Sequence, residues 1–251
     1  MPEQQSVEWL GCPDGLRRSL AEHAAGLATL LQETLVGVYV HGSVARGCSN
    51  ATTSGADVIV VLRNPCADET AGKLAALHGQ SGIALDATFV TQSQLHYDTV
   101  PTPIEFVLKP AGECKLLSRR GSHSYFLLDR QDAYECSIAL VGPPFSEIAP
   151  IVPWPLVADR LEHLLPHILP RFKNPALMLC RIAYAFARHE ICSKRDAGHW
   201  ALTALDAKWQ PLIEEALSKY EQGLRDDSGE TEELRALEQQ CRSIIVQARG
   251  T

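Results

Sequence analysis

The sequence predicts an α+β protein, in which an N-terminal mixed sheet with flanking helices is followed by a C-terminal all-helical bundle. Three observations support this prediction. Short apolar strands alternate with amphipathic helices in the first part of the chain, which is typical of a sheet with helices packed on it. A proline-rich run then interrupts both patterns, and only helical periodicity follows it. We therefore expect two domains, residues 1–150 and 151–251.

The N-terminal domain is expected to contain two helices and three main strands. From Gly15 to Gln32, leucine and alanine recur at helical spacing and predict a strongly amphipathic helix. A second helix is expected from Glu69 to Leu77. The main strands are expected at Gly37–His41, Asp57–Leu62 and Ala84–Val90, with short strands near Phe106–Leu108 and Cys114–Leu117.

The second half of the chain begins after a proline-rich segment. Prolines 143, 144, 150, 153 and 155 predict a linker, because repeated prolines stop both helices and strands. Asp226 to Gly229 is expected to form an exposed loop. The helical patterns predict a bundle of about five helices, at Leu156–Leu169, Ala176–Glu190, Ala197–Leu205, Leu212–Gly223 and Glu232–Ala248.

Composition excludes several classes of partner. The formal net charge of −7 and pI near 5.7 argue against binding to nucleic acid, which normally needs a basic surface. No apolar run approaches the ~18–20 residues that a membrane-spanning helix needs. The eight scattered cysteines form no Cys-x-x-Cys pair, which argues against zinc, and we expect no signal peptide at Met1 to Gln5. We expect a cytoplasmic monomer with free thiols.

The motif His41-Gly-Ser43 and the carboxylate of Asp57 indicate a phosphate site. Gly42 lets the backbone approach a ligand closely, and Ser43 with the following N–H groups can hold a phosphate. Asp57 begins the next strand and would lie beside this turn. The alternatives are a plain loop, with Ser43 as a helix N-cap and Asp57 as a turn cap.

These residues resemble the Gly-Ser and Asp-x-Asp signature of the nucleotidyltransferase superfamily and, more narrowly, the aminoglycoside adenylyltransferase family that modifies streptomycin and spectinomycin. The resemblance continues in order from about residue 15 to about residue 222 and includes Ser137–Pro144, Asn174–Ile182 and Ser193–Ala201. It implies a nucleotidyltransferase-type sheet and an enzyme that transfers AMP from Mg²⁺-bound ATP to a hydroxyl of a small, amine-bearing, aminoglycoside-like acceptor.

The chain departs from the family where two aspartates are expected. Gly55 replaces the first aspartate of the pair, so that only Asp57 remains. In the alternative register, Ile59 replaces the second aspartate. Two carboxylates on one strand face usually hold two Mg²⁺ ions about 3.5–4 Å apart. One carboxylate together with triphosphate oxygens could still hold one ion, at a cost in rate.

Asp86 stands where the family has its third carboxylate, a glutamate. The resemblance implies that Asp86 is a metal ligand with Asp57 and the general base that takes the proton of the acceptor hydroxyl. Aspartate is one methylene shorter than glutamate, so its reach must differ. The alternative is a structural role, because an unpaired carboxylate in the apolar strand from Ile83 to Val90 would be costly.

The resemblance implies three nucleotide-binding residues in the helical domain, Arg181, Lys194 and Tyr220. Arg181 lies on an almost wholly apolar helix, and a buried guanidinium requires an anion. The alternatives are a structural salt bridge for Arg181, a solvated loop position for Lys194 and a core position for Tyr220. His199 stands where the family tends to have aspartate. We expect the active site in a cleft between the domains.

Two other functions remain open at this stage. One is a catalytically impaired relative that binds a nucleotide or metabolite, which Gly55 favours. The other is a repurposed enzyme that performs different chemistry at the same site. Replacement of Gly55 by aspartate is expected to raise Mg²⁺-dependent turnover if the metal site is only weakened.

Overall fold

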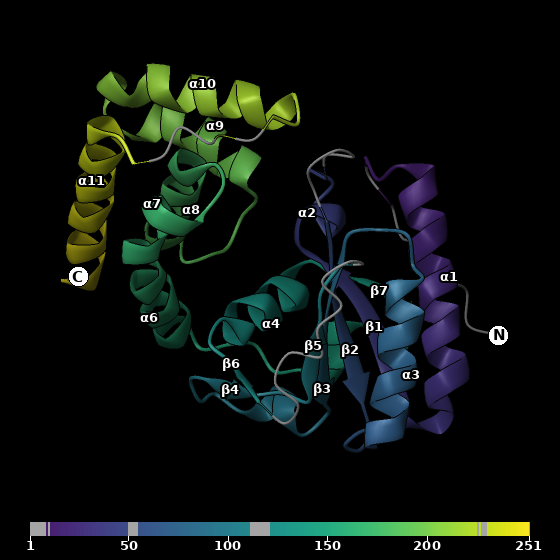
Figure 1. Cartoon of the computed structure of the whole chain (residues 1–251). Helices are drawn as coiled ribbons and strands as arrows, with labels where there is room; N and C mark the ends of the chain where they lie inside the picture. Colours follow the sequence, from purple (N-terminus) through teal and green to yellow (C-terminus); the bar gives the residue numbers. More distant parts are fainter. Residues whose placement is uncertain are drawn as a thin grey trace. The chain divides into compact units, whose positions relative to one another are not determined.

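A computed structural model of the chain describes residues 9, 11–49, 55–110, 121–224, 226 and 230–250. The described chain divides into two compact units, and the boundary falls between Val152 and Pro153 (Figure 1). The first unit contains the sheet and the second is helical. The α+β class expected from the sequence is confirmed.

The first unit is built on a five-stranded mixed sheet with the order β5-β3-β2-β1-β7. Strands β2 and β3 are parallel, and every other neighbouring pair is antiparallel. The strands are β1 (Leu35–His41), β2 (Ala56–Leu62), β3 (Leu85–Thr91), β5 (Phe106–Leu108) and β7 (Ile138–Val141). The sequence did not indicate β7 as a strand, and the segment expected near Cys114–Leu117 lies outside the described residues.

Helices pack on both faces of this sheet. The long helices α1 (Asp14–Leu31) and α3 (Asp68–Gly79) lie side by side on one face, whereas α4 (Phe126–Glu135) lies on the other (Figure 1). Because successive strand residues point to opposite faces, Val58 and Val60 join the core under α1 and α3. Ile59 and Val61 join a second core with Phe126 of α4.

Four short elements also belong to the first unit. Helix α2 (Gly42–Ala45) follows β1 directly, and α5 (Phe145–Ile148) follows β7. Strands β4 (Thr102–Pro103) and β6 (Ser122–His123) form a separate antiparallel pair.

The second unit is a bundle in which α8 is buried along most of its length. Its α-helices are α6 (Trp154–Leu164), α7 (Ile168–Arg171), α8 (Pro175–Arg188), α9 (Lys194–Ala204), α10 (Gln210–Glu221) and α11 (Glu232–Arg249). The prediction of a single helix at Leu156–Leu169 is wrong. A 3₁₀ turn at Leu165–His167 separates α6 from α7, because Pro166 cannot donate a backbone hydrogen bond within a helix.

The proline-rich segment is also more ordered than the sequence suggested. Pro144 and Pro153 are the N-cap residues of α5 and α6, and Pro155 lies in the first turn of α6. These positions tolerate proline because the first helical N–H groups have no partner within the helix. The segment therefore contains two helix starts rather than a plain linker.

All seven cysteines in the described ranges are free, and Cys114 lies outside them. No helix within the described ranges has both the length and the apolar composition needed to cross a bilayer.

Candidate active site

Three polar side chains meet at one end of the sheet in the first unit. His41 of β1 is opposite Asp57 of β2, and Asp57 is opposite Asp86 of β3. Residues that are directly opposite in neighbouring strands point to the same face. The alternation of the strands assigns this to the face that α4 covers. The structure therefore brings the two predicted carboxylates, Asp57 and Asp86, together.

Gly42 fixes the turn beside Asp57. Its φ of +69° lies in the left-handed region, which glycine adopts without strain. A Cβ atom at this position would lie 2.8 Å from Oδ2 of Asp57, so the turn leaves no room for a side chain. Ser43 is the second residue of α2, and the N-cap position belongs to His41. The N-cap alternative for Ser43 is therefore wrong.

A buried carboxylate on α4 holds the same turn. Asp132 accepts hydrogen bonds from the Gly42 amide at 2.7 Å and from Nε of Arg46 at 2.8 Å. Its Oδ2 atom also lies 3.4 Å from Nδ1 of His41, and Arg46 Nη2 donates to Glu135 at 3.1 Å. We refer to these residues, His41, Gly42, Arg46, Asp132 and Glu135, as the Asp132 network.

The charged groups in this region shift one another's pKa values. Burial lowers the pKa of His41, but the hydrogen bond to Asp132 and the charges of Asp129 and Asp57 outweigh burial and raise it to about 9. His41 is thus a cation at neutral pH, and its Nδ1–H donates to Asp132. On α4, burial also raises the pKa of Asp129, against the opposing charges of His41 and His123.

Asp57 is the carboxylate that is available to a ligand. Burial raises its pKa to about 6, although the charge of His41 opposes the shift. At neutral pH it is therefore mostly ionised. Its side chain makes no hydrogen bond or ion pair with any other residue in the described ranges. A half-buried, ionised carboxylate without a partner favours a cation.

Asp86 is in a different state, because a lysine already pairs with it. Nζ of Lys109 lies 2.7 Å from Oδ2 of Asp86, and the two side chains are 36% and 37% exposed. Lys109 follows β5, in which Leu108 is opposite Ala87, so the antiparallel register places Lys109 beside Asp86. The other oxygen, Oδ1, is buried and makes no hydrogen bond to the described residues.

These contacts can be compared with what a magnesium site requires. Mg²⁺ needs near-octahedral oxygen ligation. Across the residues that the structure describes, no three His, Cys, Asp or Glu side chains form a set of ligands for one ion. Asp57 offers free carboxylate oxygens, whereas Asp86 offers one buried oxygen and one bound to Lys109. The geometry therefore fits one cation at Asp57 and does not fit a pair.

The space around Gly55 restricts which side chains position 55 can hold. Gly55 precedes β2 by one residue and lies two residues before Asp57, so a side chain there would point to the same face. A Cβ atom at Gly55 would lie 3.1 Å from the backbone oxygen of Ala84. A side chain at position 55 thus requires β3 to shift by a few tenths of an ångström.

The predicted nucleotide residues lie in the second unit. Arg181 of α8 donates from Nε to the carbonyl oxygen of Cys192 at 2.9 Å, and it forms no salt bridge within the described part of the chain. Lys194 is the first residue of α9, directly after its N-cap Ser193, and not a loop residue. The bond to Cys192 thus brings the Arg181 side chain near the start of α9. Tyr220 lies near the end of α10 and is half-buried.

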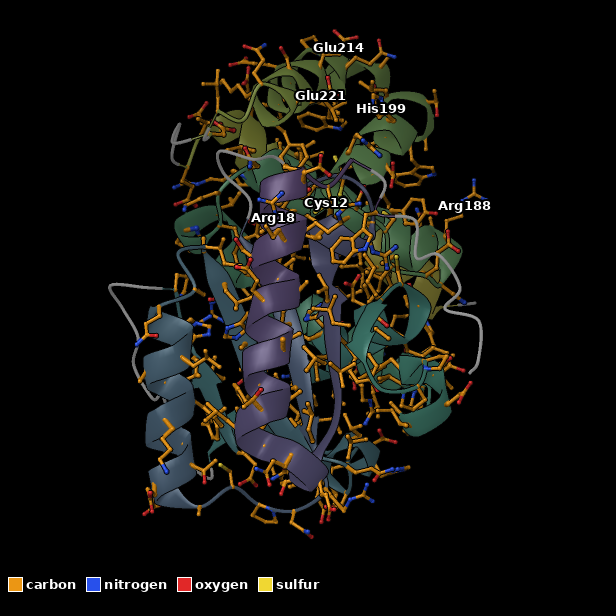
Figure 2. All side chains as sticks on the ribbon, turned by 90° about the vertical axis from the view of Figure 1, so that its right-hand side faces the viewer. Cys12, Arg18, Arg188, His199, Glu214 and Glu221 are labelled. Atoms are coloured by element: carbon orange, nitrogen blue, oxygen red, sulfur yellow. The ribbon has the colours of Figure 1, made fainter. Side chains whose placement is uncertain are left out.

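A further polar contact joins α9 to α10. Nε2 of His199 and Oε1 of Glu221 lie 3.6 Å apart, and both side chains are more than half exposed (Figure 2). In the same unit, the rings of Tyr184 and Trp200 meet edge to face at 5.4 Å between centroids.

Sequence reasoning missed the partners of the predicted residues. Lys109, Arg46 and Asp132 were not identified, and neither was α4 as a helix. The sequence carried one weak signal for α4, because Asp129 and Asp132 are three residues apart and share a helix face.

Comparisons with known proteins bear on the family and the fold. Residues 154–244 match the family model described as "Aminoglycoside adenylyltransferase, C-terminal domain". Curated relatives described as "Aminoglycoside (3'') (9) adenylyltransferase" from Klebsiella pneumoniae, Shigella flexneri and Escherichia coli are each 35% identical over 94 residues. That match covers 35% of this chain and only 36% of each relative's length.

The likeness of the fold extends much further than the likeness of the sequence. The crystal structure of spectinomycin adenyltransferase AAD(9) from Enterococcus faecialis with ATP and spectinomycin aligns with a TM-score of 0.73. The alignment covers 92% of this chain and 99% of that chain, at 17% sequence identity, and establishes similarity of fold. The chain thus has the fold of an adenylyltransferase. Together these findings support an aminoglycoside adenylyltransferase-like family for it, as its sequence indicated.

Proposed function

We propose that the protein is an adenylyltransferase that transfers AMP from ATP to a hydroxyl of a small, amine-bearing, aminoglycoside-like acceptor. The observation that supports this most directly is the free, ionised carboxylate of Asp57 beside the Gly42–Ser43 turn. The names of the relatives support the same activity. We infer further that the protein acts as a monomer in the cytoplasm, without a nucleic-acid or membrane partner.

In this proposal each site residue has a defined role. The Ser43 hydroxyl and the turn bind phosphate, and Asp57 would hold a Mg²⁺ ion that would neutralise phosphate charge. The acceptor oxygen attacks the α-phosphorus, its proton passes to the partly exposed Oδ2 of Asp86 beside Lys109, and pyrophosphate leaves. Arg181, Lys194 and Tyr220 bind the nucleotide.

Calorimetric titration of ATP into the purified protein, with and without Mg²⁺, tests the nucleotide site first. We expect binding to strengthen with Mg²⁺ in the wild-type protein and in Asp14→Asn, a control at an exposed carboxylate of the same unit. Asp57→Asn is expected to lose that strengthening. Binding that ignores both Mg²⁺ and Asp57→Asn would contradict the proposal. Pyrophosphate release with a panel of aminoglycosides then tests the acceptor.

A second candidate function is a nucleotide-binding protein with little or no catalysis. Gly55 and the ion pair that holds Asp86 favour it. Gly55→Asp distinguishes the two candidates, with Gly55→Ala as the control because any Cβ here meets the Ala84 oxygen. A weakened enzyme is expected to gain Mg²⁺-dependent turnover in Gly55→Asp relative to Gly55→Ala. No gain, in a folded variant that still binds ATP, would favour the binding protein.

A further inference from the structure

The end of the sheet has two carboxylates opposite each other and only one place for an exchangeable cation. Asp57 lacks a partner in the described part of the chain, whereas Asp86 holds the ammonium group of Lys109 at 2.7 Å. This asymmetry follows from the backbone, because the antiparallel pairing of β3 with β5 sets Lys109 next to Asp86.

A metal ion at Asp86 would have to displace the lysine. A Mg²⁺ ion bound to a carboxylate oxygen lies about 2.0–2.1 Å from it. At Oδ2 such an ion would compete with an ammonium group at hydrogen-bond distance, and two cations so close repel each other strongly. At Oδ1 it would have to enter a position that is buried from solvent. Neither oxygen of Asp86 is open to a divalent ion.

We propose that Lys109 is the resident cation of Asp86 and occupies the place that a second divalent ion would otherwise take. The site then binds a single exchangeable metal ion, at Asp57, and Lys109 supplies the other positive charge permanently. Lys109 positions and neutralises Asp86. The place of this charge in AMP transfer rests on the proposed function, whereas the exclusion of the metal does not.

The test is a titration of nucleotide-free protein with Mn²⁺, followed by electron paramagnetic resonance of the unbound ion. Lys109→Met is expected to bind Mn²⁺ about tenfold more tightly than the wild-type protein, because it frees Asp86. The double variant Lys109→Met with Asp86→Asn is expected to lose that gain. Lys109→Arg keeps the cation and is expected to behave as the wild type.

Lys73→Met provides the matched control. Lys73 pairs with Glu69 at 2.8 Å on α3 of the same unit, so its replacement also removes one positive charge and frees one carboxylate. It is expected to leave Mn²⁺ affinity unchanged. Unchanged affinity in Lys109→Met would overturn the proposal, as would an Asp86→Asn variant that binds Mn²⁺ more weakly than the wild type. Circular dichroism of each variant establishes that it is folded.

The experiment separates this proposal from the proposed function. It uses neither nucleotide nor acceptor, so a protein without transferase activity gives the same Mn²⁺ result if Lys109 excludes the metal. Conversely, an active transferase in which Lys109→Met does not tighten Mn²⁺ binding would refute only the role of Lys109.

Discussion

The Asp132 network and the Lys109–Asp86 pair lie at the same end of one sheet, but they hold their charges by different means. Asp132 is 7% exposed and accepts several hydrogen bonds, two of them at 2.7 and 2.8 Å. The Lys109–Asp86 pair is more than one-third exposed on both sides and depends on one contact. A buried network of this kind fixes a backbone, whereas a single half-exposed pair sets a local charge with little effect on the fold.

Removal of the buried carboxylate should have the largest effect. Asp132→Ala leaves the Gly42 amide and Nε of Arg46 without their acceptor in a partly buried position, although Nη2 of Arg46 keeps Glu135. We expect the free energy of unfolding to fall by about 3–5 kcal/mol, as for other broken buried pairs. Urea denaturation at pH 7 measures this. Asp159→Ala, which removes an exposed partner of Arg249, should cost less than about 1 kcal/mol, and an equal loss in both variants would contradict the comparison.

The second prediction concerns alkaline pH. Because the pKa of His41 is raised to about 9 in the folded protein, its protonated form stabilises the fold. That stability is fully present below about pH 6.5 and is lost as the pH rises through 9. We expect unfolding titrations between pH 7 and pH 8.5, below the range in which the buried thiols ionise in the unfolded chain, to show a loss of about 1–2 kcal/mol in the wild type. His41→Gln should remove this dependence, and a persistent slope would assign it to another group.

The third prediction concerns Asp57, whose charged form has the opposite effect on stability. Since burial raises the pKa of Asp57 to about 6, its ionised form destabilises the fold at neutral pH. Asp57→Asn should therefore raise the free energy of unfolding at pH 7 by about 2–3 kcal/mol. The gain should shrink as the pH falls through 6 and vanish below about pH 4, where both states bind the proton. Denaturation at pH 7 and pH 4 checks this, and a variant less stable at pH 7 would contradict it.

The smallest effect is expected at Lys109. Its pair with Asp86 is half-exposed, so Lys109→Met should change the free energy of unfolding by less than about 1 kcal/mol. The difference should shrink further in high salt, which screens exposed charges. Denaturation at low and high ionic strength measures both. A loss comparable to that of Asp132→Ala would show that the pair is part of the structural network.

The sequence predicted the elements that follow a strong hydrophobic period. Helix α1 begins and ends one residue earlier than expected, and strand β2 begins one residue earlier. The agreement is close because apolar residues recur there at helical or strand spacing. Helix α4 escaped prediction because Arg130 and Asp132 are buried in it, which breaks the usual separation of polar and apolar faces.

The site was predictable only where one short motif determines it. The Gly42–Ser43 turn directly follows β1, and the neighbouring carboxylates lie near the starts of β2 and β3. The partners of these residues depend on tertiary structure. Asp132 lies 90 residues from Gly42 along the chain, and Lys109 meets Asp86 only through the register of β5 against β3. Neither contact leaves a local periodic pattern in the sequence.

Helix α4 also makes a second attachment beside the one to Gly42. Arg130 is fully buried and donates hydrogen bonds to the carbonyl oxygens of Leu95 and Tyr97 and to the carboxylate of Asp98. Helix α4 thus forms hydrogen bonds with two separate loops, one at the end of β1 and one after β3. Amide hydrogen exchange at Gly42 and in the loop after β3 should therefore slow or quicken together, because both are released only when α4 detaches from the sheet as a cooperative unit.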